Sequence, residues 1–130
     1  MRGFRAWHTK LNRYLKDDEF FIGADGKVRN DSFGRGNYEE AFDTSDFDNG
    51  YIILEQDTGL KDKNGKPIYD GDIVDDGYSN ICEIRWREKC AGFKVVNEND
   101  GYVTNVWFVS KYGEVIGNIH ENPELLEEEE

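Results

Sequence analysis

The sequence predicts a mainly β protein, a small antiparallel barrel or sandwich with at most short helices. Glycine is frequent, with 14 residues, and proline is rare, with two, a composition typical of short strands joined by tight turns. Apolar and β-branched segments alternate with turn signals about every 8–12 residues, which is the spacing of such folds. Apolar residues nowhere follow a sustained helical spacing with proper caps, so few helices are expected.

The first half of the chain carries the weaker strand signals. Residues 3–7 alternate apolar and charged side chains and are expected to form a strand, whereas residues 11–15 are ambiguous. Residues 19–22 predict a short strand before an Asp-Gly turn. Residues 29–50 are rich in Gly, Asn, Asp and Ser with interleaved aromatic residues. A loop of this length is expected either to be a functional or variable insert or to contain one or two helical turns at residues 37–42.

The second half carries the stronger strand signals. Strands separated by turns are expected at 51–56, 68–69, 73–74, 80–86, 93–96, 102–109 and 115–119. The fourth of these alternates cleanly, which places Cys82, Ile84 and Trp86 on one apolar face. The Asn64-Gly65 pair between charged residues predicts a tight hairpin turn.

The most distinctive turn motif lies in residues 56–74 and is explained more simply by turn chemistry than by binding. Its glycines supply the positive φ that tight turns need, and its Asp side chains accept local backbone N–H bonds. Leu60 is expected to anchor the charged turn to the core. The residues assigned to this structural turn motif are Gly59, Asn64, Gly65, Asp70, Gly71 and Asp72.

Three blocks of sequence support a family assignment: residues 4–7, 56–74 and 114–126. Together they resemble the YopX family of phage and prophage proteins, and the resemblance covers nearly the whole chain, with a looser match over residues 8–50. It implies a β-rich fold with an SH3-like barrel and a phage or prophage context. It supplies no activity and no catalytic residue. Two positions depart from the family's pattern, where Asp57 replaces an aromatic residue and His8 replaces an aspartate.

The expected organisation is one domain with an appendage. Residues 1–50 are predicted to be a β-containing segment with a variable acidic loop. Residues 51–126 are predicted to be the SH3-like barrel core, completed by the N-terminal strands, and residues 127–130 a disordered acidic tail. No apolar run approaches the roughly 20 residues that span a bilayer, and the N-terminus lacks a secretory signal. The protein is therefore expected in the cytoplasm of a bacterial host, with Cys82 and Cys90 reduced.

Charge is distributed unevenly along this acidic chain. The 28 acidic and 16 basic residues give a net charge of −12. Residues 1–16 sum to +5, residues 17–57 to −9 and residues 58–99 to −1, while the run 127–130 contributes −4. The sequence thus predicts a near-neutral barrel preceded by a basic segment and an acidic aromatic insert, a pattern that weakens the idea of a whole-surface DNA mimic.

No residue pattern predicts a catalytic, metal or cofactor site. The two cysteines form no CxxC, and His8 and His120 are far apart in sequence, which excludes the usual zinc spacing. P-loop, Rossmann and nucleophile-elbow patterns are missing. Carboxylates that suggest calcium ligands miss the spacing of an EF-hand loop; they are Asp43, Asp46, Asp48 and Glu55. Catalytic residues, metal ligands and cofactors are therefore all predicted as none.

The leading functional hypothesis is a non-enzymatic phage accessory protein that binds a host or phage protein through the acidic, aromatic residues 33–51. One alternative is a nucleic-acid-binding barrel that uses Arg2, Arg5, Lys10, Arg13, Trp86 and Arg87. Another is an uncharacterised hydrolase with His8 or His120 in a pocket. The competing structural explanation puts Trp7 and Trp86 in the core and pairs the cations with the chain's own acids. The candidate binding residues are Arg5, Trp7, Arg13, Tyr38, Phe42, Arg85, Trp86 and Arg87.

Overall fold

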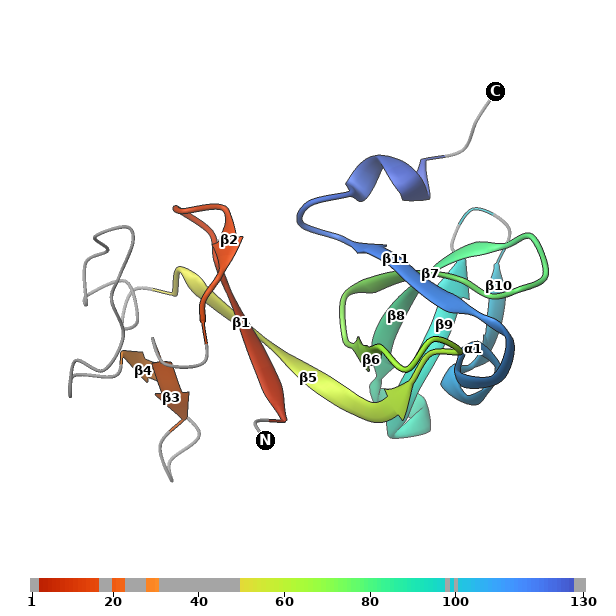
Figure 1. The fold of residues 1–130 in the computed structure, drawn as a ribbon, viewed down its shortest axis with the longest axis horizontal. Helices are drawn as coiled ribbons and strands as arrows, with labels where there is room; N and C mark the ends of the chain where they lie inside the picture. Colours follow the sequence, from red (N-terminus) through yellow and green to blue (C-terminus); the bar gives the residue numbers. More distant parts are fainter. Residues whose placement is uncertain are drawn as a thin grey trace. The chain divides into compact units, whose positions relative to one another are not determined.

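A computed structural model describes residues 3–16, 20–22, 28–30, 50–97, 99 and 101–127. The chain divides into two compact units, Met1–Glu55 and Gln56–Glu130, which are drawn in Figure 1. The Asp-Gly turn predicted before residue 28, the helical turns predicted at 37–42 and the disordered tail predicted at 127–130 lie wholly or mostly outside the described residues.

The first unit is built from short antiparallel strands and the start of a longer one. Its strands are β1 (Phe4–His8), β2 (Arg13–Tyr14), β3 (Phe20–Ile22), β4 (Val28–Asn30) and the beginning of β5 (Ile52–Lys61). β1 pairs with β2 and lies next to β5, while β3 and β4 form a separate hairpin. Its small core is made of Ala6, Leu15 and Phe20, which are buried, with Ile52 and Leu54 packed against them.

The second unit contains a curled five-stranded antiparallel sheet with the strand order β10–β9–β8–β7–β11 (Figure 1). The strands of this sheet are β7 (Asp72–Asp75), β8 (Ile81–Arg87), β9 (Gly92–Asn97), β10 (Tyr102–Asn105) and β11 (Glu114–Asn118). A further strand, β6 (Pro67–Tyr69), pairs with the end of β5. Neighbouring strands follow each other in sequence from β7 to β10. The last strand, β11, returns to the free edge of β7.

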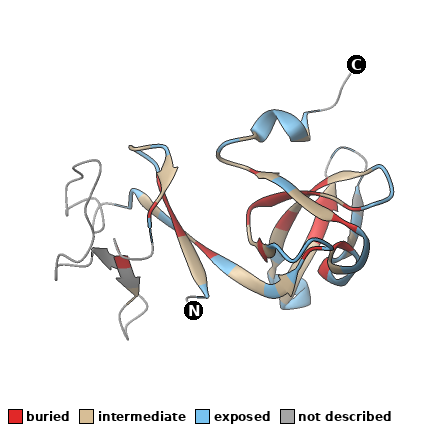
Figure 2. Ribbon diagram, in the orientation of Figure 1, coloured by how far each residue is buried: buried red, intermediate tan, exposed pale blue. Residues whose placement is uncertain are grey.

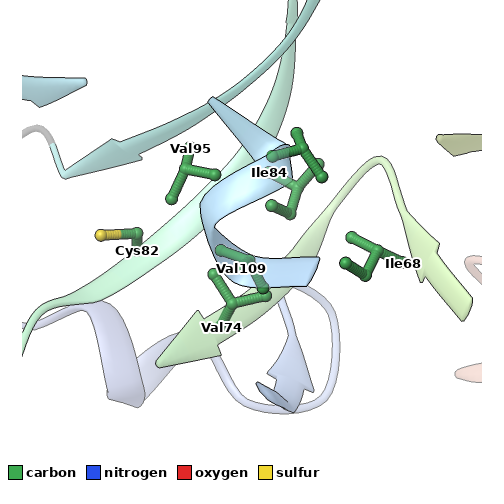
Figure 3. Close-up of a cluster of buried hydrophobic side chains, with 7 residues drawn as sticks. Ile68, Val74, Cys82, Ile84, Val95 and Val109 are labelled. Atoms are coloured by element: carbon green, nitrogen blue, oxygen red, sulfur yellow. The ribbon is translucent and has the colours of Figure 1, made fainter. Parts of the chain in front are cut away.

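Alternate residues of these strands form one apolar core. Figure 3 shows side chains from β6, β7, β8 and β9 gathered around the helix α1, and Figure 2 shows buried residues along the same strands. The members of the cluster are Ile68, Val74, Cys82, Ile84, Val95, Val106 and Val109. Leu60 packs against this cluster, as expected from the sequence. The residues between them face the opposite side of the sheet, where Val96 is also buried.

The strand predicted over 102–109 is wrong in its second half. β10 ends at Asn105, and residues Val106–Tyr112 form the helix α1. Val106 and Val109 are both buried, and residues three apart share one face of a helix but opposite faces of a strand. The apolar residues of this segment are compatible with a strand or a helix when the sequence is considered alone. Burial of both valines against the sheet requires the helix.

The fold class is confirmed: the protein is mainly β and antiparallel, with short helices. Besides α1, the described residues contain the 3₁₀ turns η2 (Glu88–Cys90) and η3 (Pro123–Leu126). β5 is longer than predicted, because it continues through Gly59, where the pairing with β6 shifts register. The predicted domain limits and the SH3-like topology stay predictions.

One buried carboxylate joins the β5–β6 turn to β11. Asp62 is 5% exposed, and its Oδ1 accepts backbone N–H bonds from Asn64 and Lys66, each at 2.9 Å. Its Oδ2 accepts the N–H of Val115 on β11, also at 2.9 Å. The hairpin turn predicted at Asn64-Gly65 is therefore present, and an aspartate that the sequence analysis left unassigned organises it.

These contacts set the charge state of Asp62. Burial by itself would raise the pKa of this carboxyl, because it penalises the charged form. The three backbone N–H donors and the Lys66 ammonium outweigh burial, so the pKa of Asp62 lies below its ordinary value of 3.8. A lowered folded-state pKa means that the ionised carboxylate stabilises the fold above the unfolded-state pKa, and that this contribution disappears as the pH falls through the folded-state pKa.

We expect Asp62→Asn to lower the free energy of unfolding of the second unit by roughly 2–3 kcal/mol at pH 7, because a charged acceptor of buried N–H groups is lost. Urea unfolding followed by tryptophan fluorescence measures this change, and the difference from wild type should shrink below about pH 4. The control is Asp57→Asn, which weakens one exposed bond to the Gly59 N–H and should cost about 0.5 kcal/mol or less. Equal losses in both variants would contradict the role given to Asp62.

Candidate functional site

The helix α1 turns three aromatic side chains and one cation toward solvent. Trp107 is 50% exposed, Phe108 37% and Tyr112 48%, and Lys111 is exposed as well. At about 100° per residue, these four positions fall on one continuous arc opposite the buried valines. Both faces of the helix therefore carry apolar side chains: valines on the buried face and aromatic rings on the face toward solvent.

Ring contacts fix this surface and extend it beyond the helix. Trp107 and Phe108 meet edge to face with ring centroids 5.4 Å apart, and the Lys111 ammonium lies 5.7 Å from the Trp107 ring. Tyr112 meets Tyr78 edge to face at 5.8 Å, and Tyr78 is itself 59% exposed. We call these five residues the α1 surface.

A glycine controls how closely the Tyr78 loop approaches the end of α1. Gly77 has φ +87°, and a Cβ at this position would overlap the carbonyl oxygen of Tyr112. Its N–H donates to Asp75 Oδ1 at 2.9 Å. The close approach that this glycine permits brings the two tyrosines into contact.

A second exposed aromatic lies at the end of β8. Trp86 is 47% exposed, so the expectation that it points into the core is wrong. It keeps the strand alternation of Cys82 and Ile84, but it lies at the end of β8, where its ring meets Phe93 of β9 edge to face at 5.1 Å. The flanking Arg85 and Arg87 face the other side of the strand.

The N-terminal candidates are placed differently from Trp86. Trp7 is 5% exposed and packs edge to face on Tyr14 at 4.9 Å. The Arg5 guanidinium lies 4.6 Å from the Tyr14 ring centroid, and its Nε donates to Glu55 Oε1 at 2.9 Å. Tyr14 donates its hydroxyl to the same oxygen at 2.8 Å. Arg5 therefore neutralises a buried carboxylate, and Trp7 belongs to the packed face of β1.

The other candidates in the first unit give less information. Arg13 donates from its guanidinium to the carbonyl oxygen of Tyr14 at 3.1 Å. Tyr38 and Phe42, like nearly all of the acidic insert proposed as a binding surface, lie outside the described residues. At its described end, Tyr51 is 38% exposed, and the Lys10 ammonium lies 5.0 Å from its ring centroid.

The hydrolase alternative required His8 or His120 in a pocket, and both make hydrogen bonds to or from the backbone. His8 is fully buried, and its Nδ1 accepts the backbone N–H groups of Lys10 and Leu11, each at 3.2 Å. The backbone N–H of His120 donates to Asn118 Oδ1 at 3.0 Å within the turn after β11. Within the described residues, His, Cys, Asp and Glu side chains form no group of three or more that could hold a metal ion.

The turn-motif residues make backbone contacts. Gly59, Gly65 and Gly71 have φ between +85° and +88°, the region that favours glycine. Asp72 accepts the backbone N–H of Tyr69 at 2.8 Å. Gly71 donates to the carbonyl of Ile84 and accepts from Ile119, each at 2.9 Å, so this turn links β8 to the end of β11.

The sequence analysis missed the α1 surface. It assigned Trp107 and Phe108 to a strand and gave Tyr78 and Tyr112 no role. The signal that would have found it is the pair of valines three residues apart, Val106 and Val109, between Asn105 and Gly113, which can serve as caps of a short helix.

These observations define a small, mainly β protein whose second unit displays aromatic and basic side chains on its surface. The family described as YopX protein matches residues 3–127. The chain therefore belongs to the YopX family, as its sequence blocks predicted.

Solved structures agree with this assignment. Protein EF1440 from Enterococcus faecalis is 29% identical with a TM-score of 0.64, and the match covers 96% of this chain and 97% of that one. Protein yopX from Bacillus subtilis is 28% identical with a TM-score of 0.56, covering 95% of this chain and 97% of that one. No curated protein sequence matches the chain. In the described part of the chain, no helix has the length and apolar character needed to cross a membrane.

We expect Gly77→Ala to destabilise the second unit by roughly 2 kcal/mol or more and to separate Tyr78 from Tyr112, because a methyl group at positive φ would meet the helix backbone. The control is Gly65→Ala, which has a similar φ of +85° but nothing within 4 Å of the added Cβ, and which should cost only about 1 kcal/mol. Thermal unfolding and the near-ultraviolet circular dichroism of the tyrosines measure both effects. If the two variants behave alike, the close approach at Gly77 is not a constraint.

Proposed function

We propose that this protein is a non-enzymatic accessory protein of a phage or prophage that binds a partner protein, in the bacterial cytoplasm, through the α1 surface of an SH3-like barrel. The single observation that carries the proposal is the outward face of α1. It exposes three aromatic rings on seven residues of helix. The phage context and the SH3-like topology rest on the family resemblance.

Exposed rings of this kind are typical of binding surfaces. Single exposed hydrophobic residues are ordinary, whereas a contiguous group marks an interaction site. Trp and Tyr are enriched among the residues that dominate binding energy, because large rigid rings bury much area at a small cost in entropy. The α1 surface contains Trp107 and Tyr112 beside Phe108, held by ring contacts before a partner arrives, so little ordering is needed on binding.

The site favours a protein over a nucleic acid as the occupant of the α1 surface. Lys111 is the one cation of that face, and the nearest polar hollow, beside Tyr112, is lined by two carboxylates, Asp75 and Glu114, and by Lys63. A nucleic acid would require more clustered cations. An apolar protein segment with polar flanks fits the rings and the mixed charges.

The test is a comparison of the wild-type chain with the double variant Trp107→Ala/Phe108→Ala. Each immobilised protein is exposed to lysates of Bacillus subtilis and Enterococcus faecalis, the sources of the two similar structures, and a retained protein is then purified and titrated by calorimetry. The double variant should bind at least about 30-fold more weakly, the loss of roughly 2 kcal/mol expected of central aromatic residues.

The control variant removes equally exposed apolar side chains from the same unit. Ile116→Ala/Leu125→Ala lies on β11 and η3, where both residues are 37% exposed, and should bind as wild type does. Retention of the same proteins by all three chains would overturn the proposal. A wild-type dimer on size exclusion that becomes monomeric in the double variant would assign the surface to a second copy instead.

A further inference from the structure

A polar hollow of about 290 Å³ opens beside the α1 surface, where the helix ends. Residues that line it include Lys63 of the β5–β6 turn, Asp75 at the end of β7, Tyr112 at the end of α1 and Glu114 at the start of β11. Tyr112 belongs both to this hollow and to the α1 surface. A protein segment bound across the rings of the helix would therefore reach the hollow as well.

Two carboxylates of the hollow lie opposite each other in the sheet. In the antiparallel register of β7 and β11, Glu114 is directly opposite Asp75. The Cβ atoms of such a pair are about 4.5–5.5 Å apart, and like charges at these positions destabilise the pairing. A cation placed between the two carboxylates would remove this repulsion.

Neutral groups contact these carboxylates within the protein. Asp75 Oδ1 accepts the backbone N–H of Gly77 at 2.9 Å, and Glu114 Oε2 accepts a hydrogen bond from Asn64 Nδ2 at 3.2 Å. Among the described residues, Lys63 is the cation that lines the hollow, and no ion pair joins it to either carboxylate. Two carboxylates against one ammonium leave the hollow with a formal charge of −1.

The aromatic ring beside these carboxylates suits a cationic side chain. The Tyr112 ring is 48% exposed and is held edge to face by Tyr78. The face of a tyrosine ring attracts lysine and arginine side chains, and a guanidinium also donates to carboxylates. A metal ion fits less well, because the part of the chain that the structure describes has no group of three or more potential metal-ligating side chains.

We propose that the segment bound by the α1 surface carries an arginine or lysine beside a large apolar residue, and that this cation enters the hollow between Asp75 and Glu114. The apolar residue packs on Phe108, which lies one helical turn before Tyr112 on the same side of α1. The inference rests on the proposed function, since it names the class of segment that the α1 surface selects. It goes further by assigning the choice of a basic residue to side chains outside that surface.

Lys63 makes the charge of the occupant testable. An ammonium that lines the hollow repels an incoming cation and attracts an incoming anion. Removal of the Lys63 charge should therefore strengthen the binding of a basic segment and weaken the binding of an acidic one. Lys61, which is also exposed and lies two residues earlier, is the matched control.

The experiment selects binders from a displayed library of random peptides, about twelve residues long, on the immobilised full chain. The wild-type chain should enrich peptides with an arginine or lysine beside a large apolar residue. One selected peptide is then synthesised with a fluorescein label, both as selected and with its basic residue replaced by glutamine. In anisotropy titrations, the glutamine peptide should bind the wild-type chain about fivefold to tenfold more weakly, because two exposed ion pairs are lost.

The variant Asp75→Asn/Glu114→Gln removes both charges and keeps an oxygen acceptor at each position. It should bind the basic peptide about fivefold to tenfold more weakly and no longer distinguish it from the glutamine peptide. The control Glu88→Gln/Glu124→Gln removes the same charge from two exposed positions of the second unit and should bind within about twofold of wild type. Thermal unfolding checks that each variant is folded.

The Lys63 variants give the sign of the interaction. Lys63→Gln should bind the basic peptide about twofold more tightly than wild type, and Lys61→Gln should bind it as wild type does. Weaker binding in Lys63→Gln would overturn the inference, because it would indicate an anionic occupant of the hollow.

The remaining outcomes separate this inference from the proposed function. Selected peptides that lose binding in Trp107→Ala/Phe108→Ala but carry no basic residue would leave the proposed function standing and overturn the inference. Equal binding of a basic peptide by wild type and by Asp75→Asn/Glu114→Gln would do the same. If no peptide is enriched, or if Trp107→Ala/Phe108→Ala binds the selected peptides as wild type does, the proposed function fails and this inference fails with it.

Discussion

The second unit depends on the buried carboxylate of Asp62. One side chain accepts N–H groups from its own turn and from Val115, fifty-three residues later in the chain. A buried ionised group is costly unless its oxygens are satisfied, and here backbone donors satisfy it on both oxygens. The carboxylate thereby fixes where β11 begins, and the carbonyl of Gly113, just before β11, accepts the N–H of Lys63 from the same turn.

The position of α1 follows from this constraint. The helix ends where β11 begins, so the anchored strand start and the buried Val106 and Val109 hold both ends of a seven-residue segment. A helix this short has little stability of its own, and packing must supply the rest. With one face committed to the core, the rings of Trp107, Phe108 and Tyr112 can only point outward. The α1 surface is thus a consequence of how the chain returns from β10 to the edge of β7.

The exposed aromatic residues of the second unit have different origins. The α1 surface results from a helix that replaces a strand, whereas the exposure of Trp86 results from plain strand alternation carried to the end of the sheet. On β8, the same alternation that buries Cys82 and Ile84 leaves Trp86 47% exposed at the end of the strand, where it contacts Phe93. Burial of an alternating face therefore depends on position along the strand as well as on parity.

The fold class, most of the strands, the Asn64-Gly65 turn and the family were all predictable from the sequence. These features depend on local patterns: strands on alternation, turns on glycine and asparagine, the family on contiguous blocks. The candidate site was predicted less well. Arg85, Trp86 and Arg87 were identified because cations beside an aromatic residue are visible in sequence. Arg5 and Trp7 showed the same signal, but in the first unit Arg5 pairs with Glu55 and Trp7 packs on Tyr14.

By itself, the sequence determined which residues alternate, where the chain turns and which family it belongs to. Only the tertiary structure decided that residues 106–112 form a helix, that the Asp62 carboxylate accepts a backbone N–H from β11, and that Trp86 is exposed while Trp7 is covered. The physical reason is that each of these outcomes depends on partners distant in sequence. Helix and strand are close in free energy for a short apolar run, so the contacts of Val106 and Val109 with the sheet decide that residues 106–112 form a helix. The Val115 N–H bond to Asp62 anchors the start of β11, just after this helix ends.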